Sequence, residues 1–406
     1  MTSKRKIIND PVFGFINIPD GLIFRLINHP YIQRLNRIKQ LGLAFYVYPG
    51  AVHSRFHHSL GAMHLMSEAI ANLRLKGHCI SEEEEQGALA CILMHDVGHG
   101  PFSHVLESSI VDGIDHEDIS LMMMNVINLE MNGALGVAID IFRDVYPKRF
   151  LHQLVSGQLD VDRLDYLRRD SFFTGVTEGN IGSARIIKML NLKDDRLVIE
   201  AKGIYSIENF LMSRRLMYWQ VYLHKTAVAA EKMLNNTLRR AKYLAGCGVE
   251  LEATPALRYF LYGRIDGSCF EGSGEALGYF ADLDDSDIWC SLKAWTRHSD
   301  RVLALLSGGL VGRRLFKIEY FASPVAEDLI LVKKAGFADV YGISLDDAAS
   351  LVSSDEISTD MYSWEDDSID ILFKDGTTKD ISEASDMLNI QLLSKRVRKY
   401  YLCFLR

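Results

Sequence analysis

The segment ILMHDVGHGPFSHVLE, residues 92–107, constrains the fold and chemistry of this chain more than any other stretch. An apolar run typical of a buried helix ends directly in His95 and Asp96. An unpaired carboxylate at the end of a buried helix is very costly, so Asp96 needs a partner, and a divalent cation would satisfy it. Two glycines and Pro101 follow and predict the end of the helix. The segment therefore predicts a helix that delivers ionisable side chains to a buried site.

Histidines are concentrated in one part of the chain. Nine of the 13 lie between His53 and His116, and histidine is the commonest metal ligand and acid–base residue near neutral pH. One imidazole and one carboxylate leave a cation short of ligands, and residues 53–61 (HSRFHHSLG) and 159–170 (LDVDRLDYLRRD) offer more. A site of mixed nitrogen and oxygen ligands suits Mn, Fe, Zn or Mg without distinguishing among them. A buried hydrogen-bonded cluster without a metal is the alternative.

The composition of the chain argues against several classes of protein. The 406 residues are 48% hydrophobic and carry a net charge of −8, which argues against an extended nucleic-acid-binding surface. The six cysteines are scattered without a CxxC pair, which indicates reduced thiols. The N-terminus lacks the apolar segment of a secretory signal, and no run of about 18 apolar residues occurs. We therefore expect a cytoplasmic protein without a transmembrane helix.

The pattern of apolar residues predicts a mainly α fold. Helical spacing indicates a helical region over residues 1–250, with a capping box at Ser81 and Glu84. Later β-forming stretches predict an α+β C-terminal region, residues 251–406. The expected helices are at residues 59–76, 81–95, 152–172 and 207–240. The expected strand-forming segments are RLVIEAKG (196–203), RLFKIEYF (314–321), DLILVKKAGF (328–337) and DILFKDGTTKDI (370–381), the last with a KDGT hairpin turn.

The motifs resemble those of the HD-domain metal-dependent phosphohydrolases. The order is H…HD…D, with HDVGHGPFSH preceded by IKQLGLAFYVYPGAVHSRFHHSLG and followed by DHED, LDVDRLDYLRRD and RRLMYWQVYLHK. This set is similar to the sterile-alpha-motif/HD-domain deoxynucleoside triphosphate triphosphohydrolases. The resemblance is to bacterial relatives that lack the sterile-alpha-motif domain, since 406 residues leave no room for it. The similarity covers residues 5–230, and it implies an HD domain at residues 50–175 within a helical catalytic region.

The resemblance implies an enzyme that cleaves deoxynucleoside triphosphates to deoxynucleoside and triphosphate. It implies one divalent metal ion, held by His58, His95, Asp96 and Asp162. The substrate-binding residues that it implies are Gln40, Leu41, Arg55, Arg163, Tyr166, Asp170, Arg214, Tyr218 and Tyr222. The catalytic residues that it implies, near the α-phosphate, are His99, His104 and His116, with Glu117 beside His116 to orient it. His104 and His116 are equal candidates for the group that protonates the departing 5′ oxygen.

An acidic protein needs a focused basic pocket to hold a triphosphate, which carries about four negative charges. Arg55, Arg163 and Arg214 lie far apart in the sequence, but on segments that we expect to converge on the metal. A guanidinium offers phosphate several hydrogen bonds in a fixed plane. The plainer interpretation of Arg214 is a solvated helix face, and that of Tyr218 and Tyr222 is core packing.

Alternatives to this function stay open. One is an HD phosphohydrolase that acts on nucleoside monophosphates or other phosphoesters, and another is a regulator that binds nucleotides or single strands without turnover. The resemblance also implies a homo-oligomer, and some relatives are activated by a guanine nucleotide. Here Asn28 and Asn36 stand where relatives carry an Asp that reads guanine and an Arg that binds phosphate. Since asparagine cannot mimic two carboxylate acceptors, the sequence disfavours guanine-nucleotide activation.

Overall fold

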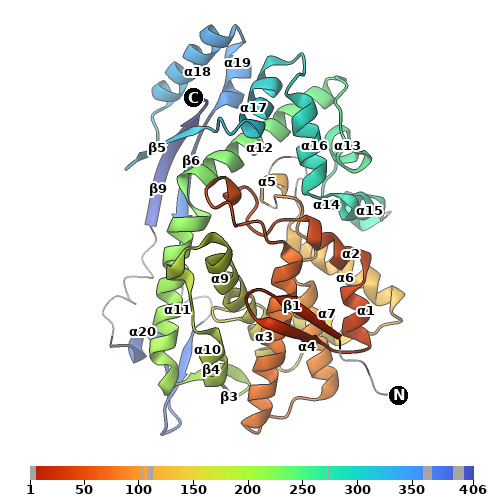
Figure 1. The fold of residues 1–406 in the computed structure, drawn as a ribbon, viewed down its shortest axis with the longest axis vertical. Coiled ribbons are helices and arrows are strands. Elements are labelled where there is room, and N and C mark those ends of the chain that lie inside the picture. The colour runs from red at the N-terminus through yellow and green to blue at the C-terminus, as the bar shows by residue number, and fades with distance from the viewer. Residues whose placement is uncertain are drawn as a thin grey trace.

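The structure is a computed structural model and describes residues 6–102, 104–107, 109, 113–272, 274–359, 368–386 and 397–406. It confirms the expected mainly α fold with an α+β C-terminal region. In Figure 1 the N-terminal half of the chain forms the lower part of the molecule, and most residues after about 250 form the upper part. Among the described residues, no helix has both the length and the apolar character needed to span a membrane.

Three helices in the lower part position the predicted metal ligands. They are α3 (Arg55–Leu75), α4 (Glu82–Met94) and α9 (Val161–Thr174), and α3 packs against both of the others. The predicted ligands lie on α3 and α9 or directly follow α4. The predicted capping box at the start of α4 is present, because the side chains of Ser81 and Glu84 each accept the other's backbone N–H. Local hydrogen bonding therefore fixes the start of α4, and its buried apolar side chains pack against α3.

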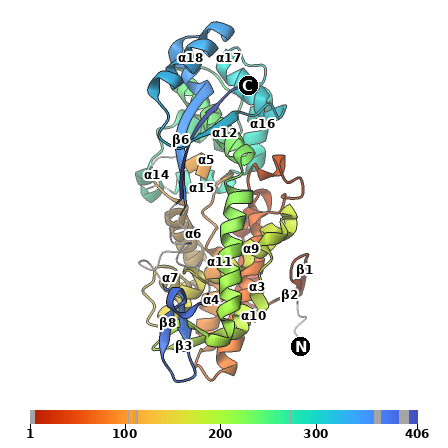
Figure 2. The same ribbon diagram turned by 90° about the vertical axis from the view of Figure 1, so that its left-hand side faces the viewer.

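The remaining helices surround this centre and build the upper part (Figures 1 and 2). Those before residue 250 are α1 (Leu22–Ile27), α2 (Pro30–Arg34), α5 (His104–Glu107), α6 (His116–Glu130), α7 (Gly136–Phe142), α8 (Arg149–Val155), α10 (Ser183–Met189), α11 (Ile204–Met217) and α12 (Lys225–Gly246). Those after it are α13 (Pro255–Tyr262), α14 (Gly267–Gly272), α15 (Glu275–Asp282), α16 (Asp285–Trp295), α17 (Arg301–Val311), α18 (Glu327–Tyr341), α19 (Leu345–Ala348) and α20 (Ile381–Ala384).

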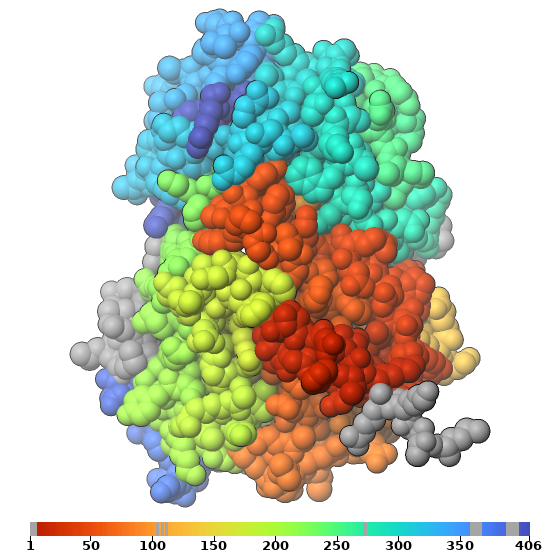
Figure 3. All heavy atoms as spheres, viewed as in Figure 1, coloured from red at the N-terminus to blue at the C-terminus, as the bar shows by residue number. Residues whose placement is uncertain are grey.

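The strands of the described residues form three small sheets. An N-terminal hairpin pairs β1 (Lys6–Asp10) with β2 (Gly14–Ile18), and Figure 3 shows it in dark red on the surface. In the upper part, β9 (Val397–Phe404) lies between β5 (Lys317–Phe321) and β6 (Val352–Thr359). The remaining sheet has the strand order β3 (Leu190–Lys193), β4 (Arg196–Glu200), β7 (Asp370–Leu372) and β8 (Thr378–Asp380). Because β7 pairs in parallel with β4, the C-terminal region returns to the lower part (Figure 2).

Several expected elements differ from the structure. The helix expected over residues 152–172 is two helices, α8 and α9, because the Asp160 side chain accepts the backbone N–H of Arg163 and starts a new helix. The helix expected over residues 207–240 is broken into α11, a π-helical turn at Tyr218–Tyr222, and α12.

The strand expected in DLILVKKAGF is wrong, because this segment lies in helix α18. Acidic residues in its first turn and a left-handed Gly342 at its end favour the helix. An apolar run as short as LILV does not distinguish helix from strand. The other strand-forming segments contain β4, β5 and the β7–β8 hairpin, whose turn includes Gly376 at φ 85°.

Gly61 lets α3 lie close to α9. A Cβ atom at this position would stand 1.9 Å from Asp165 Oδ1 and 2.1 Å from Arg169 Nη2. We therefore expect Gly61→Ala to lower the free energy of unfolding by about 1–3 kcal/mol through overpacking, although alanine is the better helix former. Chemical denaturation would measure this change. The matched control is Gly336→Ala inside α18, where a Cβ meets nothing within 4 Å and should slightly stabilise; equal effects of the two changes would contradict the interpretation.

Candidate active site

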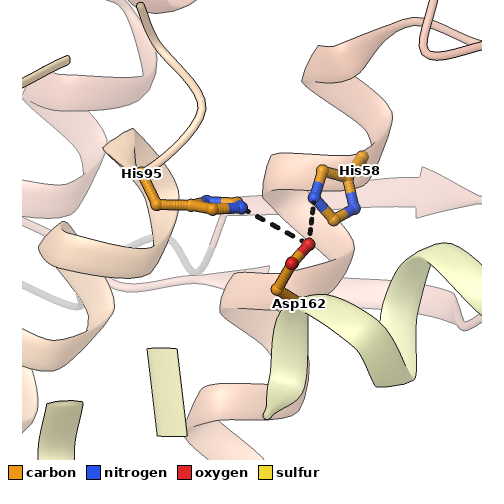
Figure 4. A group of neighbouring side chains, drawn as sticks. All are labelled: His58, His95 and Asp162. Carbon is orange, nitrogen blue, oxygen red and sulfur yellow. Dashed lines mark ion pairs between the residues drawn. The ribbon is translucent and has the colours of Figure 1, made fainter. Parts of the chain in front are cut away.

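Side chains from three distant stretches converge on one point (Figure 4). His58 comes from the first turn of α3, His95 directly follows α4, and Asp162 lies in the first turn of α9. Asp162 Oδ1 lies 3.0 Å from His58 Nε2 and 3.4 Å from His95 Nε2. One ligand atom from each residue falls within 4.8 Å of the other two, so this trio could hold a metal ion.

The hydrogen bonds of the two imidazoles suit this role. His58 Nδ1 donates to Asp165 Oδ2 at 2.7 Å, and His95 Nδ1 donates to the carbonyl oxygen of Ile92 at 2.7 Å. Each Nε2 atom is buried and faces Asp162 Oδ1 at the shared point, the position from which it would bind a cation. Metal-binding histidines are commonly fixed in this way. Two nitrogens and a carboxylate oxygen also suit a divalent transition-metal ion.

The negative charge of the carboxylates around His58 favours the binding of a cation at this point. Burial lowers the pKa of His58, but the carboxylates of Asp162 and Asp165 outweigh burial and raise this pKa to about 10. The potential that holds a proton on the buried imidazole would equally stabilise a divalent cation, which would replace that proton. The residues present therefore fit a metal ion.

Asp96 lies at the edge of this trio. Its Oδ1 is 3.3 Å from His95 Nε2, and its Oδ2 is 3.8 Å from His58 Nε2. Arg55 Nη1 donates to the same Oδ2 at 2.6 Å. Arg55 therefore neutralises and orients Asp96, whose role as a fourth ligand stays a prediction.

Two predicted catalytic histidines lie side by side next to Asp96. The rings of His99 and His116 stack with centroids 3.9 Å apart, and His99 Nε2 lies 3.4 Å from Asp96 Oδ1. Burial, followed by the charge of Arg55, lowers the pKa of His99 to about 3, so its ring is neutral at pH 7. Glu117 follows His116 at the start of α6 with an exposed side chain. His104 begins α5, but its side chain lies outside the described part of the structure.

A cavity of about 410 Å³ adjoins Arg55, and most of the predicted substrate-binding residues line it. These are Gln40, Leu41, Arg55, Tyr166, Asp170, Tyr218 and Tyr222. Lys39, Phe102 and Glu231 also line it and were not predicted from the sequence. The cavity is large enough for a nucleoside-sized ligand, and it combines an aromatic wall with a small number of polar groups.

Asp170 is fixed at the wall of this cavity. Its Oδ1 pairs with His53 Nε2 at 2.7 Å, and its Oδ2 accepts from the hydroxyl of Tyr222 at 2.8 Å. The π-helical turn places Tyr218 and Tyr222 in edge contact, with ring centroids 5.2 Å apart. Such a turn widens the helix locally and is frequent at functional sites. It replaces the regular helix expected from the sequence and brings both tyrosines to one wall.

Arg163 and Arg214 also come together, although neither lines the cavity. Gln158 Oε1 accepts from Arg163 Nη1 at 3.3 Å and from Arg214 Nη1 at 3.0 Å. The guanidinium of Arg214 lies 5.9 Å from the ring centroid of Tyr218, so the pair adjoins the tyrosine wall. Gln158 had no predicted role, because its contact with Arg214 joins two segments that only the tertiary fold brings together.

Comparisons with known proteins agree with this geometry. Residues 181–247 match the family described as HD associated region. The chain is 33% identical to the uncharacterized protein YwfO of Bacillus subtilis, over 94% of this chain and 88% of that protein. It is 29% identical to the deoxynucleoside triphosphate triphosphohydrolase SAMHD1 of Homo sapiens, over 58% of this chain and 44% of that protein.

A solved structure is similar over almost the whole chain. It is a phosphohydrolase from Bacteroides thetaiotaomicron, with a TM-score of 0.97 and 63% sequence identity, and the match covers 99% of this chain and 100% of that one. Together with the sequence relatives, this similarity confirms the family to which the H…HD…D motifs pointed. The chain belongs to the HD-domain phosphohydrolases.

Proposed function

We propose that this protein hydrolyses deoxynucleoside triphosphates to deoxynucleoside and triphosphate. The observation that carries the proposal is the position of the 410 Å³ cavity, which shares Arg55 with the candidate metal centre and adjoins the Arg163–Arg214 pair. A nucleoside would fill the cavity and its phosphates would extend toward the arginines. Relatives named deoxynucleoside triphosphate triphosphohydrolase support the same substrate class.

Each group in the site has a proposed part in this reaction. A bound divalent cation would supply Lewis-acid chemistry, which activates water and neutralises phosphate charge. His58, His95 and Asp162, with Asp96 beside them, would hold that cation. Arg163 and Arg214 would bind the outer phosphates, which need several hydrogen-bond donors in fixed positions.

The sugar and the leaving oxygen would meet other residues. Asp170 and Tyr222 would hold the deoxyribose, because their mutual hydrogen bond fixes both at the cavity wall. His116 would hand a proton to the 5′ oxygen as its bond to the α-phosphorus breaks. Burial keeps the neighbouring His99 neutral by lowering its pKa, so we assign His99 the part of orienting the stacked ring of His116.

Product analysis in labelled water tests this function. The purified protein, loaded with Mn²⁺, would be incubated in H₂¹⁸O with each deoxynucleoside triphosphate, ribonucleoside triphosphate and deoxynucleoside monophosphate. We expect deoxynucleoside and triphosphate, with ¹⁸O in the triphosphate, because attack at the α-phosphorus breaks the phosphorus–O5′ bond. Orthophosphate release, or activity on monophosphates alone, would favour a different phosphohydrolase. Tight nucleotide binding without turnover would favour a regulator.

We also propose that the protein is a homo-oligomer. Helix α18 has no buried residue, and Leu331, Val332 and Val340 are 50%, 68% and 72% exposed. Apolar surface on a helix commonly packs against another chain. Sedimentation velocity at micromolar concentration should show a species larger than the 45.9 kDa monomer; a monomer across this range would contradict the proposal.

A further inference from the structure

A buried chain of charged side chains connects the candidate metal centre with the N-terminal hairpin. His58 Nδ1 donates to Asp165 Oδ2 at 2.7 Å. Arg169 donates to both oxygens of Asp165, from Nε at 2.9 Å and from Nη2 at 2.8 Å. Arg169 Nη1 then donates to Asp10 Oδ2 at 2.6 Å. We call Asp165, Arg169 and Asp10 the carboxylate–arginine relay.

The relay is shielded from solvent along its length. The side chains of Asp165 and Arg169 are 0% exposed and that of Asp10 is 3% exposed. Ionised groups at such depth are stable only when they are paired and hydrogen-bonded, as they are here. The absence of a side chain at Gly61 leaves the space that Asp165 and Arg169 occupy between α3 and α9.

At its far end the relay is built into the hairpin turn. Asp10 Oδ1 accepts the backbone N–H groups of Val12 and Phe13, each at 2.9 Å, so one carboxylate both shapes the turn and holds Arg169. The ring of Phe13 lies over the guanidinium of Arg169, and the ring centroid is 5.6 Å from the guanidinium carbon. The hairpin, which lies at the surface in Figure 3, therefore reaches the buried helix through Asp10.

We propose that the carboxylate–arginine relay positions His58 for metal binding and couples the N-terminal hairpin to the metal centre. The relay holds two carboxylates and one guanidinium, so it presents net negative charge to the Nδ1 side of His58. A carboxylate at Nδ1 fixes the ring and raises the basicity of Nε2, which strengthens a metal ligand. The inference rests on the proposed metal site but not on the identity of the substrate.

Asp10 acts on His58 through Arg169. Without the charge of Asp10, the guanidinium would interact more strongly with Asp165, and Asp165 would become a weaker acceptor for the imidazole N–H. Arg169 would also lose the contact that holds Nη1 in place. Asp165, Arg169 and Asp10 are thus positioning residues, with the effect decreasing from Asp165 to Asp10.

Mn²⁺ binding to the metal-free full chain tests the relay. Electron paramagnetic resonance of the free ion would give dissociation constants for the wild type, Asp165→Asn and Asp10→Asn. We expect Asp165→Asn to weaken binding by roughly 10–100-fold and Asp10→Asn by a smaller factor. In Asp10→Asn the amide oxygen of the new side chain can still accept the turn N–H groups, so the hairpin should persist. Activity of Asp10→Asn should be low at limiting Mn²⁺ and recover at saturating Mn²⁺.

Asp300→Asn is a matched control. Asp300 also caps a backbone N–H, that of Leu303, and also pairs with an arginine, Arg240, but it lies at α17 in the upper part of the molecule. The loss of this cap and ion pair should lower the unfolding temperature of Asp300→Asn. Because Asp300 does not belong to the relay, the Mn²⁺ dissociation constant of this variant should equal that of the wild type.

The possible results distinguish an error in the relay proposal from an error in the metal-site proposal. Weakened Mn²⁺ binding in both relay variants, with normal binding in Asp300→Asn, supports the inference. If the wild type binds Mn²⁺, His58→Ala abolishes that binding, and both relay variants bind like the wild type, the relay is wrong and the metal site stands. If His58→Ala binds Mn²⁺ like the wild type, the metal site is wrong and the inference falls with it.

Discussion

Asp162→Ala is expected to lower kcat for deoxynucleoside triphosphate hydrolysis by about 10³-fold or more. Asp162 supplies the carboxylate of the trio, and its Oδ1 lies 3.0 Å and 3.4 Å from the Nε2 atoms of His58 and His95. Without the Asp162 carboxylate, the ligand set would carry less negative charge and would bind a divalent cation more weakly. The chemistry of a bound metal contributes several kcal/mol to catalysis, and each 1.4 kcal/mol or so is a factor of ten in rate.

Metal binding and turnover should fail together in this variant. Saturating Mn²⁺ should raise the unfolding temperature of the wild type, because an ion that binds only the folded chain stabilises it, by about 2.7 kcal/mol at a hundred times its dissociation constant. The same addition should not stabilise Asp162→Ala. Asp140→Ala, at an exposed position of α7, is the control and should behave like the wild type. Activity of Asp162→Ala within tenfold of the wild type would show that the trio does not hold the catalytic ion.

The sequence predicted that His58, His95 and Asp162 come together, because each lies in a segment with a recognisable pattern, His58 in the histidine-rich residues 53–61. Their role as metal ligands stays a prediction. His95 and Asp96 end an apolar helix, and Asp162 lies in the first turn of a helix rich in aspartate. Sequence alone, however, did not show which nitrogen of His58 faces the site. That depends on Asp165, whose contact with His58 crosses from α9 to α3. The pairing of Asp165 with Arg169 four residues later is a signal that could have pointed to the relay.

Contacts between distant elements account for what the sequence did not predict. The apolar spacing of residues 207–240 continues smoothly, so it gives no sign of the π-helical turn that brings Tyr218 and Tyr222 to one wall. The pairing of β7 with β4 joins Ile371 to Ile199, and no local pattern fixes such a partner. In the same way, α18 is a helix because its ends favour one, while its short apolar run fits either structure.

His116→Gln is expected to lower kcat for deoxynucleoside triphosphates by about 10²–10⁴-fold, the usual contribution of a positioned proton donor. His116 opens α6 beside the candidate metal centre, and its ring stacks on His99 at 3.9 Å. Glutamine retains hydrogen bonding but cannot deliver a proton near pH 7. Mn²⁺ affinity should be unchanged, because His116 is not one of the ligand trio. His78→Gln, which removes an imidazole bonded to Asn191 away from the cavity, is the control.

A substrate whose leaving group needs no proton separates proton donation from positioning. p-Nitrophenyl triphosphate releases a stable phenolate when the bond to the α-phosphorus breaks, whereas a deoxynucleoside leaves as a strongly basic alkoxide unless it is protonated. If His116 is the proton donor, His116→Gln should lose far less activity on the phenyl ester than on the nucleotide. An equal loss on both substrates would show that His116 positions the phosphates instead. His104→Gln should be measured in parallel, since the residue whose loss depends on the leaving group is the proton donor.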